Sequence, residues 1–280
     1  MSALPEKELR YESEKVAYEG LEALTKIPIG PMRVSALSAH ELTRRLIGHT
    51  FGNKTHHVVT ANAQFYVLAE RDAIFRRCVE EAEYVCADGV SVVMACKWLG
   101  NADISRVAGV DLIPMLCEQG ATLGLPIYFL GGKPNSAAES AALMMRQYPG
   151  LKVAGIGCPP VGFQDDPKEL QKVLKNIKVA NPAILFVALG APYQEYFIQQ
   201  HVRPLNIPVA MGVGGSFEMI SGMVQRAPRW IRRGGLEWAY RWAQEPQRLG
   251  KRYLVGNTLF SYYVMRYLLS RSWREARRTP

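Results

Sequence analysis

Short apolar runs alternate with longer helix-like segments between about residues 31 and 215, and this alternation restricts the possible folds more than any other feature. The runs are rich in β-branched residues and apolar throughout, as strands are when helices cover both faces of a sheet. We expect strands at residues 32–37, 57–61, 84–86, 127–130, 152–156, 184–189 and 208–213. Helices are expected at 38–49, 72–82, 90–99, 110–123, 135–147 and 167–179. The pattern predicts an α/β fold, a Rossmann-like sandwich with a mostly parallel sheet.

Three of the predicted strands run directly into glycine. In open α/β sheets ligands bind beyond the carboxyl ends of the strands, where glycine lets the backbone approach a phosphate or a ribose. We therefore expect a nucleotide site lined by Gly131, Gly132, Gly190, Gly214 and Gly215. For any single loop, an ordinary tight turn is an equally good interpretation. The sequence has neither GxGxxG nor GxxxxGK[ST], which argues against an NAD enzyme and a P-loop nucleotidase.

Charge is distributed unevenly along the chain. The net charge is +9, and thirteen of the 34 Lys and Arg residues but only three of the 25 acidic residues lie from Arg226 onward. The last 55 residues thus carry +10 while the rest is nearly neutral. Such a basic tail indicates contact with an anionic surface, whether phospholipid, nucleic acid or a diphosphate-bearing substrate. We expect an N-terminal extension (1–30), a catalytic core (31–225) and a basic, aromatic, membrane-associating appendage (226–280).

The tail is also rich in aromatic residues. Residues 235–243 read as a short helix, and residues 249–269 mix aromatic and aliphatic side chains with two arginines, which suits an interfacial segment better than a membrane span. A helix packed on the body or on a neighbouring subunit is the alternative. Residues 1–26 lack the apolar core of a signal peptide, and the five cysteines form no CxxC pair, so we expect a reduced protein, peripheral on the cytoplasmic face of the membrane.

Several short motifs occur in a defined order between Pro31 and about Tyr253. They are Thr60-Ala-Asn62, Ala87-Asp88-Gly89, Arg106-Val-Ala-Gly109-Val-Asp111, Gly190-Ala-Pro192-Tyr-Gln194-Glu195, Gly212-Val-Gly214-Gly215-Ser216-Phe217, Arg226-Ala-Pro228, Gly235-Leu-Glu237-Trp238-Ala-Tyr240-Arg241 and Glu245-Pro246-Gln-Arg248. This ordered set resembles the WecG/TagA/CpsF glycosyltransferase family. The resemblance implies an inverting enzyme that transfers a hexose or an N-acetylhexosamine-type sugar from a UDP-sugar to a polyprenyl-diphosphate-linked saccharide, in cell-surface polysaccharide synthesis.

The resemblance also implies roles for single residues. Asp88, at a strand end before Gly89, is expected to remove the proton of the acceptor hydroxyl; a helix cap or turn aspartate is the alternative. Thr60 and Asn62 follow another strand, where they could hydrogen-bond sugar hydroxyls or cap the next helix. Arg106 is expected to contact a diphosphate, or otherwise to pair on the surface with Asp103 or Asp111. The family motifs also suggest substrate-binding roles for Asp111, Gln194 and Glu195, although in an arbitrary loop Gln194 would more often face solvent.

The departing nucleoside diphosphate needs its negative charge stabilised. The sequence has no DxD motif, and adjacent His56 and His57 would point to opposite faces of a strand, so we expect no metal and no other cofactor. The resemblance suggests instead that the tail folds over the site and supplies Arg241 and Arg248. Lys251 stands where another arginine would be expected. Residues 157–163 replace a GYF-like family segment, so no role is carried over to that loop.

Two other functions compete with this interpretation. A nucleic-acid-binding protein would use the basic, aromatic tail, but that function leaves the glycine-ended strands of the neutral body unexplained. Another Rossmann-like nucleotide enzyme, such as a dehydrogenase, would share the sheet. Homo-oligomerisation is compatible with the sequence, which does not identify the donated sugar.

Overall fold

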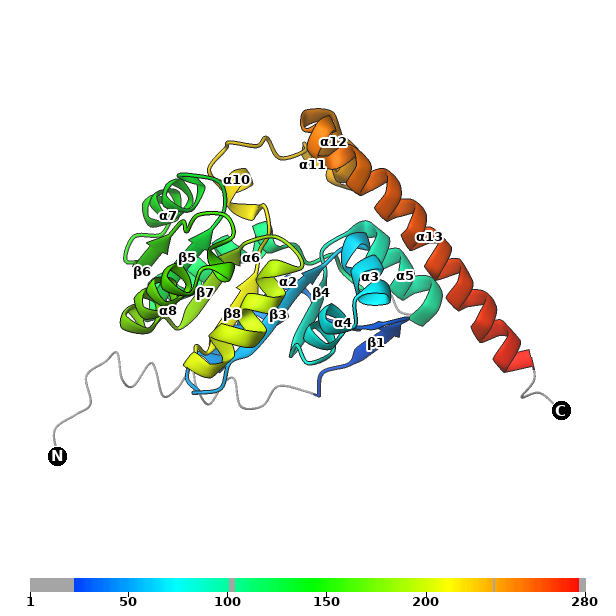
Figure 1. The fold of residues 1–280 in the computed structure, drawn as a ribbon, viewed down its shortest axis with the longest axis horizontal. Coiled ribbons are helices and arrows are strands. Elements are labelled where there is room, and N and C mark those ends of the chain that lie inside the picture. Colours follow the sequence, from blue (N-terminus) through cyan, green and yellow to red (C-terminus); the bar gives the residue numbers. More distant parts are fainter. Residues whose placement is uncertain (1–22, 101–103, 234, 277–280) are drawn as a thin grey trace.

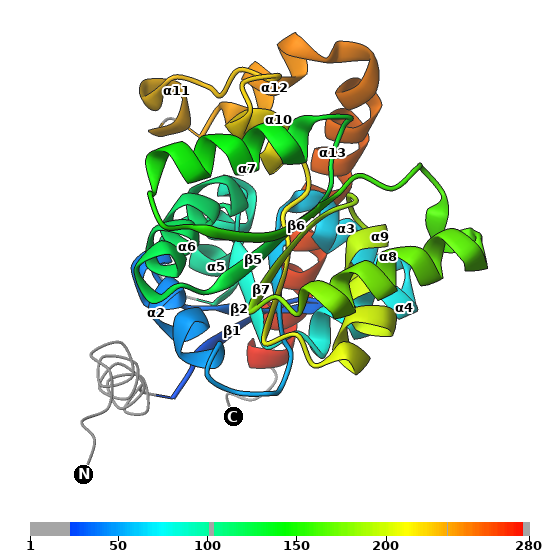
Figure 2. The same ribbon diagram turned by 90° about the vertical axis from the view of Figure 1, so that its left-hand side faces the viewer.

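The computed structural model describes residues 23–100, 104–233 and 235–276, so most of the predicted N-terminal extension lies outside it. Its centre is a sheet of six parallel strands in the order β4-β3-β8-β7-β5-β6, covered by helices on both faces (Figures 1 and 2). The strands are β3 (His56–Ala61), β4 (Tyr84–Ala87), β5 (Pro126–Gly131), β6 (Lys152–Gly157), β7 (Ile184–Ala188) and β8 (Val209–Gly212). The predicted Rossmann-like sandwich with a parallel sheet is confirmed.

Alternate residues of each strand contribute to opposite faces of the sheet. On one face Val58 and its counterparts pack against α2 (Ala39–His49), α6 (Gly109–Leu123) and α7 (Ser136–Gln147). On the other face Val59 packs against α3 (Ala63–Arg71), α4 (Ala73–Glu80) and α5 (Val90–Gly100). The second face continues over β5, β7 and β8 with α8 (Pro167–Ala180), α9 (Tyr193–Phe197) and the π-helical turn η2 (Ile198–Val202). Burial on both faces explains why the strands read as continuous apolar runs.

The first predicted strand is not part of this sheet. Met32–Ser35 is β2, which forms an antiparallel hairpin with β1 (Lys26–Ile29). The hairpin lies beside the edge strand β4, where the Val85 amide donates to Ser35 Oγ at 3.1 Å. Among the described strands β2 pairs in a ladder with β1 alone, so the hairpin covers the edge without extending the sheet.

The C-terminal segment forms three helices, α11 (Arg229–Arg233), α12 (Glu237–Gln244) and α13 (Pro246–Ala276). The predicted short helix corresponds to α12, whereas the predicted interfacial segment is part of a single 31-residue helix. Figure 1 shows α13 running beside α3 and α5 from the top of the molecule to its flank. Within the described part of the chain, no helix combines the length and the hydrophobicity that a bilayer crossing requires.

All six strands point the same way, so their carboxyl ends share one edge of the sheet. The ends of β3 and β4 deliver Asn62 and Asp88 to this edge, and the short helix α10 (Ser216–Ile220) follows β8 there. The α11–α12 segment lies over the same edge (Figure 1). Asn62, Asp88 and α12 therefore lie on the same side of the sheet.

Candidate active site

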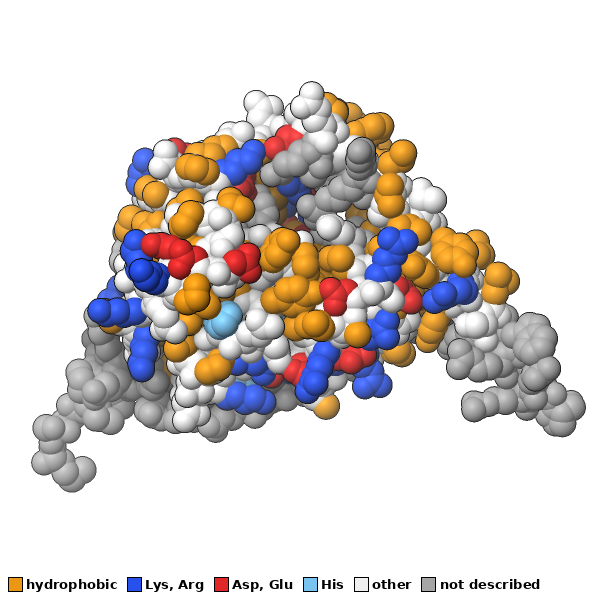
Figure 3. Space-filling model, in the orientation of Figure 1, with side chains coloured by type: hydrophobic (Ala, Val, Ile, Leu, Met, Phe, Trp, Pro, Cys, Tyr) orange, Lys and Arg blue, Asp and Glu red, His pale blue; other side chains and the backbone are white. Residues whose placement is uncertain are grey.

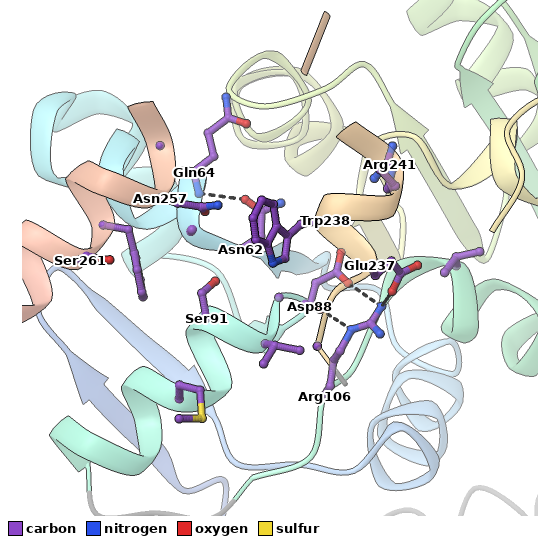
Figure 4. A pocket seen from close by; sticks show the side chains of 18 of the residues that line it. Asn62, Gln64, Asp88, Ser91, Arg106, Glu237, Trp238, Arg241, Asn257 and Ser261 are labelled. Carbon is purple, nitrogen blue, oxygen red and sulfur yellow. Dashed lines mark hydrogen bonds and ion pairs between the residues drawn. The ribbon is translucent and has the colours of Figure 1, made fainter. Parts of the chain in front are cut away.

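A cavity of about 400 Å³ opens between the carboxyl edge of the sheet and the C-terminal helices. Its polar residues come from both parts of the chain, with Asn62 and Asp88 following β3 and β4, and Glu237 and Arg241 on α12 (Figure 4). Asn257 and Ser261 of α13 lie on the other side, one helical turn apart. The core and the C-terminal helices thus each supply part of the cavity wall.

Apolar side chains form much of the cavity wall. Val90, Met94 and Trp98 project from successive turns of α5, and Phe260 faces them from α13. Trp238 of α12 lies centrally above the floor (Figure 4). A cavity that combines polar groups with apolar walls from α5 and α13 suits a ligand that is itself part polar and part apolar.

Asp88 forms the acidic part of the floor. Its backbone amide donates to Ala61 O at 2.8 Å, which fixes the strand end, and its side chain is 31% exposed. Burial raises the pKa of Asp88 to about 6, although Arg106 opposes the rise; Glu237 adds to it. A carboxylate with such a pKa is ionised at neutral pH and still basic enough to accept a proton.

Arg106 lies between two carboxylates. Its Nε donates to the backbone carbonyl of Asp88, while one terminal nitrogen is 2.8 Å from Glu237 Oε2 and 3.7 Å from Asp88 Oδ1. It does not pair with Asp111, one of the surface partners considered from the sequence. Asp111 instead makes two hydrogen bonds of 2.6 and 2.7 Å with Arg226. Burial disfavours the charge of Asp111, but this bidentate bond lowers its pKa.

Glu237 joins these two ion pairs. It contacts Arg106 at 2.8 Å and Arg226 at 3.7 Å, so one chain of charges runs from Asp88 to Asp111. We call these five residues, Asp88, Arg106, Glu237, Arg226 and Asp111, the charge network. Outside this network, the ion pair between Lys133 and Glu245 at 3.1 Å also joins the core to the C-terminal segment.

Other residues expected at the site lie beneath it. Thr60 is buried and donates from Oγ1 to Gly212 O at 2.8 Å, which couples β3 to β8. Gln194 is buried too; its amide donates to Glu195 Oε1 and its oxygen accepts from the Gly214 amide at 3.0 Å. These residues support the strand ends and loops and do not line the cavity.

Most of the glycines at the strand ends do not line this cavity. A Cβ on Gly131 would lie 2.6 Å from Ala188 O, and one on Gly132 would lie 2.3 Å from Ser136 Oγ, so close packing and positive φ already require glycine there. Gly190 and Gly214 also lie outside the cavity lining. Gly215 lies against Arg241, whose terminal nitrogen would be 3.2 Å from an added Cβ.

The structure therefore brings Asn62, Asp88, Arg106 and Arg241 together in one cavity. The side chain of Arg248 lies outside the described residues. Several lining residues were not predicted, among them Gln64, Met94, Trp98, Asn257 and Phe260. Glu237 and Trp238 could have been predicted from the sequence, since they stand in the same motif as Arg241. Asn257 and Ser261 could have been predicted as well, because their spacing puts two polar residues on one face of an aromatic-rich helix.

Comparison with known proteins gives two findings. The model of the family described as "Glycosyl transferase WecG/TagA/CpsF family" matches residues 27–274. A relative from Bacillus spizizenii (strain W23), named N-acetylglucosaminyldiphosphoundecaprenol N-acetyl-beta-D-mannosaminyltransferase, is 35% identical over 196 residues, which cover 70% of this chain and 74% of that protein. The family match spans the core and the C-terminal helices alike, and therefore every segment that lines the cavity.

Proposed function

Since the chain belongs to the WecG/TagA/CpsF glycosyltransferase family and is thus a glycosyltransferase, we propose that it transfers a sugar from a UDP-sugar to a polyprenyl-diphosphate-linked saccharide, with inversion and without a metal. The observation that carries this proposal is the position of Asp88, a carboxylate with a pKa of about 6 on the floor of a cavity that arginines also enter. The name of the Bacillus relative supports the lipid-linked acceptor.

The proposed reaction is a single displacement. The acceptor hydroxyl oxygen attacks the anomeric carbon, the bond between that carbon and the diphosphate oxygen breaks, and the nucleoside diphosphate leaves with the bonding electrons. Asp88 takes the hydroxyl proton as the new bond forms. Attack from the side opposite the leaving group inverts the anomeric centre. Arg241 and Arg106 are the described cavity cations that can stabilise diphosphate charge.

The two halves of the cavity favour the proposed acceptor. Asn62 offers the NH2 group of its amide for sugar hydroxyls near Asp88, while its Oδ1 caps α3 by accepting from the Gln64 backbone amide at 3.0 Å. Trp98, Met94 and Phe260 offer an apolar wall for the first units of an isoprenoid chain. A soluble sugar acceptor would leave that wall without a partner, which favours a lipid-linked one.

Membrane association belongs to the same proposal. Residues of α13 that face away from the core leave large apolar side chains exposed, namely Leu254, Val255, Tyr262, Met265 and Leu269. We call this set the α13 ridge; hydrophobic side chains follow the slope of this helix in Figure 3. An exposed apolar ridge on a segment of net charge +10 suits an anionic bilayer surface. The enzyme would then work at the cytoplasmic face, where nucleotide sugars occur.

A panel of UDP-sugars tested against a synthetic polyprenyl-diphosphate N-acetylglucosamine examines the proposal directly. UDP-N-acetylmannosamine is the first donor to test because of the name of the Bacillus relative. We expect an acceptor one sugar heavier by mass spectrometry, release of UDP, an inverted anomeric linkage by NMR, and an unchanged rate in excess chelator. Failure of every donor in the panel would refute the proposed substrates, and loss of the rate on chelation would refute metal independence.

A further inference from the structure

Glu237 sits where two arginines of the site compete for a carboxylate. It belongs to α12, and its side chain is only 14% exposed. It is one of three acidic residues in the basic tail. Arg106, from the core, is 2.8 Å from Glu237 and 3.7 Å from the carboxylate of Asp88. The guanidinium of Arg106 is thus held by Glu237 in preference to Asp88.

This arrangement matters for a base, because a guanidinium paired closely with a carboxylate stabilises its charged form and weakens its affinity for a proton. Arg106 would reach the Asp88 carboxylate with little movement, since its Nε already donates to the Asp88 backbone carbonyl. Glu237 keeps the terminal nitrogen engaged elsewhere. Arg226, fixed by Asp111, holds Glu237 from the other side at 3.7 Å.

We propose that Glu237 is a positioning residue: by holding the Arg106 guanidinium closer to itself than to the Asp88 carboxylate, it limits how far Arg106 weakens the affinity of Asp88 for a proton, and it does so only while α12 is docked on the core. The proposal rests on the proposed role of Asp88 in transfer. Docking of the C-terminal helices is then required for the basicity of Asp88 as well as for closure of the cavity. We expect full activity only when these helices are docked on the core.

The charges around Asp88 are consistent with this role. From the core, Arg106 lowers the pKa of Asp88 while Asp111 raises it, and from α12 Glu237 raises it while Arg241 lowers it. Arg226, from the segment after α10, faces the same group, and Cys86 precedes it on β4. Of these groups, Glu237 is the acidic one that contacts Arg106 directly. Its removal deletes a negative charge and frees a positive one, and both changes lower the pKa of Asp88.

The experiment compares Glu237→Gln with Glu245→Gln, which removes the other acidic partner of a core cation on the C-terminal segment. The acid limb of kcat/KM against pH is measured for both variants, and the Asp88 carboxyl is titrated by ¹³C NMR without substrate, with its signal identified from Asp88→Asn. For Glu237→Gln we expect both readouts to move to lower pH by about one unit. For Glu245→Gln we expect neither to move.

The outcomes distinguish the positioning role of Glu237 from the proposed function of the enzyme. An unchanged Asp88 titration in a folded Glu237→Gln variant overturns the positioning role, whether or not the enzyme is active. A wild-type enzyme without transfer, but with the NMR shift present, overturns the proposed function and leaves the electrostatic coupling intact. If Glu237→Gln unfolds, Glu237→Asp supplies the test. Because Glu237→Asp keeps the negative charge, its acid limb should lie closer to that of the wild type than the acid limb of Arg106→Leu does. Equal shifts for Glu237→Asp and Arg106→Leu would contradict the proposal.

Discussion

At the scale of single residues, Asp88 is the group on which the proposed chemistry depends. It lines the cavity, its amide is fixed to the end of β3, and its pKa of about 6 suits proton abstraction at neutral pH. Asp88→Asn keeps the shape of the side chain but removes the proton acceptor. We expect a loss of transfer of about 10²- to 10⁴-fold, the contribution typical of a general base.

UDP affinity and thermal stability should stay near wild type in Asp88→Asn, as measured by calorimetry and thermal unfolding. Asp165→Asn, at an exposed position on the turn η1 (Phe163–Asp165), is the control and should retain full activity. Turnover by Asp88→Asn within tenfold of wild type would remove Asp88 from the role of base.

Glu195 gives a second residue-level prediction, on stability. It is fully buried, one of its carboxyl oxygens has no hydrogen-bond partner, and burial raises its pKa to about 8. The folded protein therefore keeps a proton that the unfolded chain releases near pH 4.5. Stability linked to this group is full below pH 4.5 and falls as the pH rises towards 8.

Glu195→Gln resembles the protonated acid in shape and can still accept from the Gln194 amide, so it should remove this pH dependence. The free energy of unfolding, measured from pH 5 to 8 by denaturant titration, should decline less in the variant than in wild type, with the largest difference at pH 8. Glu80→Gln on the exposed face of α4 is the control and should follow the wild-type curve. Parallel curves for wild type and Glu195→Gln would contradict the prediction.

At the scale of elements, α13 is held to the core through its contact with α3. The ring of Phe260 meets that of Tyr66 edge to face, with centroids 5.2 Å apart, and both side chains are buried. Arg266 adds an ion pair to Glu70 at 3.2 Å, but an exposed pair of this kind contributes little. Burial of apolar side chains, with Phe260 and Val264 the most buried of those described, is thus the main described anchor of the helix.

Phe260→Ala should therefore loosen α13 without unfolding the sheet. Truncation of a buried Phe costs roughly 3–5 kcal/mol when the site cannot collapse, and undocking of one helix limits that cost to the local structure. We expect faster hydrogen exchange in α13 and α3, unchanged exchange in β3 and β8, and reduced transfer. Tyr262→Ala, at an exposed aromatic position two residues later, is the control. Equal protection of α13 in both variants would show that other contacts hold the helix.

The elements also show what the sequence could and could not predict. The alternation of apolar runs predicted the parallel sheet, and parallel strands necessarily bring Asn62 and Asp88 to one edge. Gln194 and Glu195 were expected in the site because they stand in a family motif, yet a local pattern cannot tell a loop residue that faces a ligand from one that folds back under its neighbour. Glu237 stands in the same motif as Arg241, but its ion pair could not be predicted, because its partner Arg106 is distant in sequence and only tertiary packing joins them.

At the scale of the whole molecule, the charge and the exposed surface of the tail predict where the enzyme works. The α13 ridge lies on a segment that is basic in sequence, whereas the rest of the chain is close to neutral. Insertion of the ridge at headgroup depth would remove apolar surface from water, and anionic lipids would add a salt-sensitive attraction. The α3–α13 contact would remain intact, because the ridge faces away from it.

The double variant Leu254→Glu/Leu269→Glu tests this orientation on folded protein. Both side chains are well exposed, so the core should be unaffected, while two carboxylates would oppose binding to an anionic surface. We expect at least a tenfold weaker association with phosphatidylglycerol vesicles in sedimentation assays, roughly 1.4 kcal/mol or more, and slower transfer to vesicle-bound acceptor than to a short-chain soluble analogue. Val179→Glu on α8 is the control, an exposed apolar position distant from the C-terminal helices in sequence. If the double variant binds vesicles as wild type does, the ridge has another partner, and the tail serves the enzyme by closing the cavity alone.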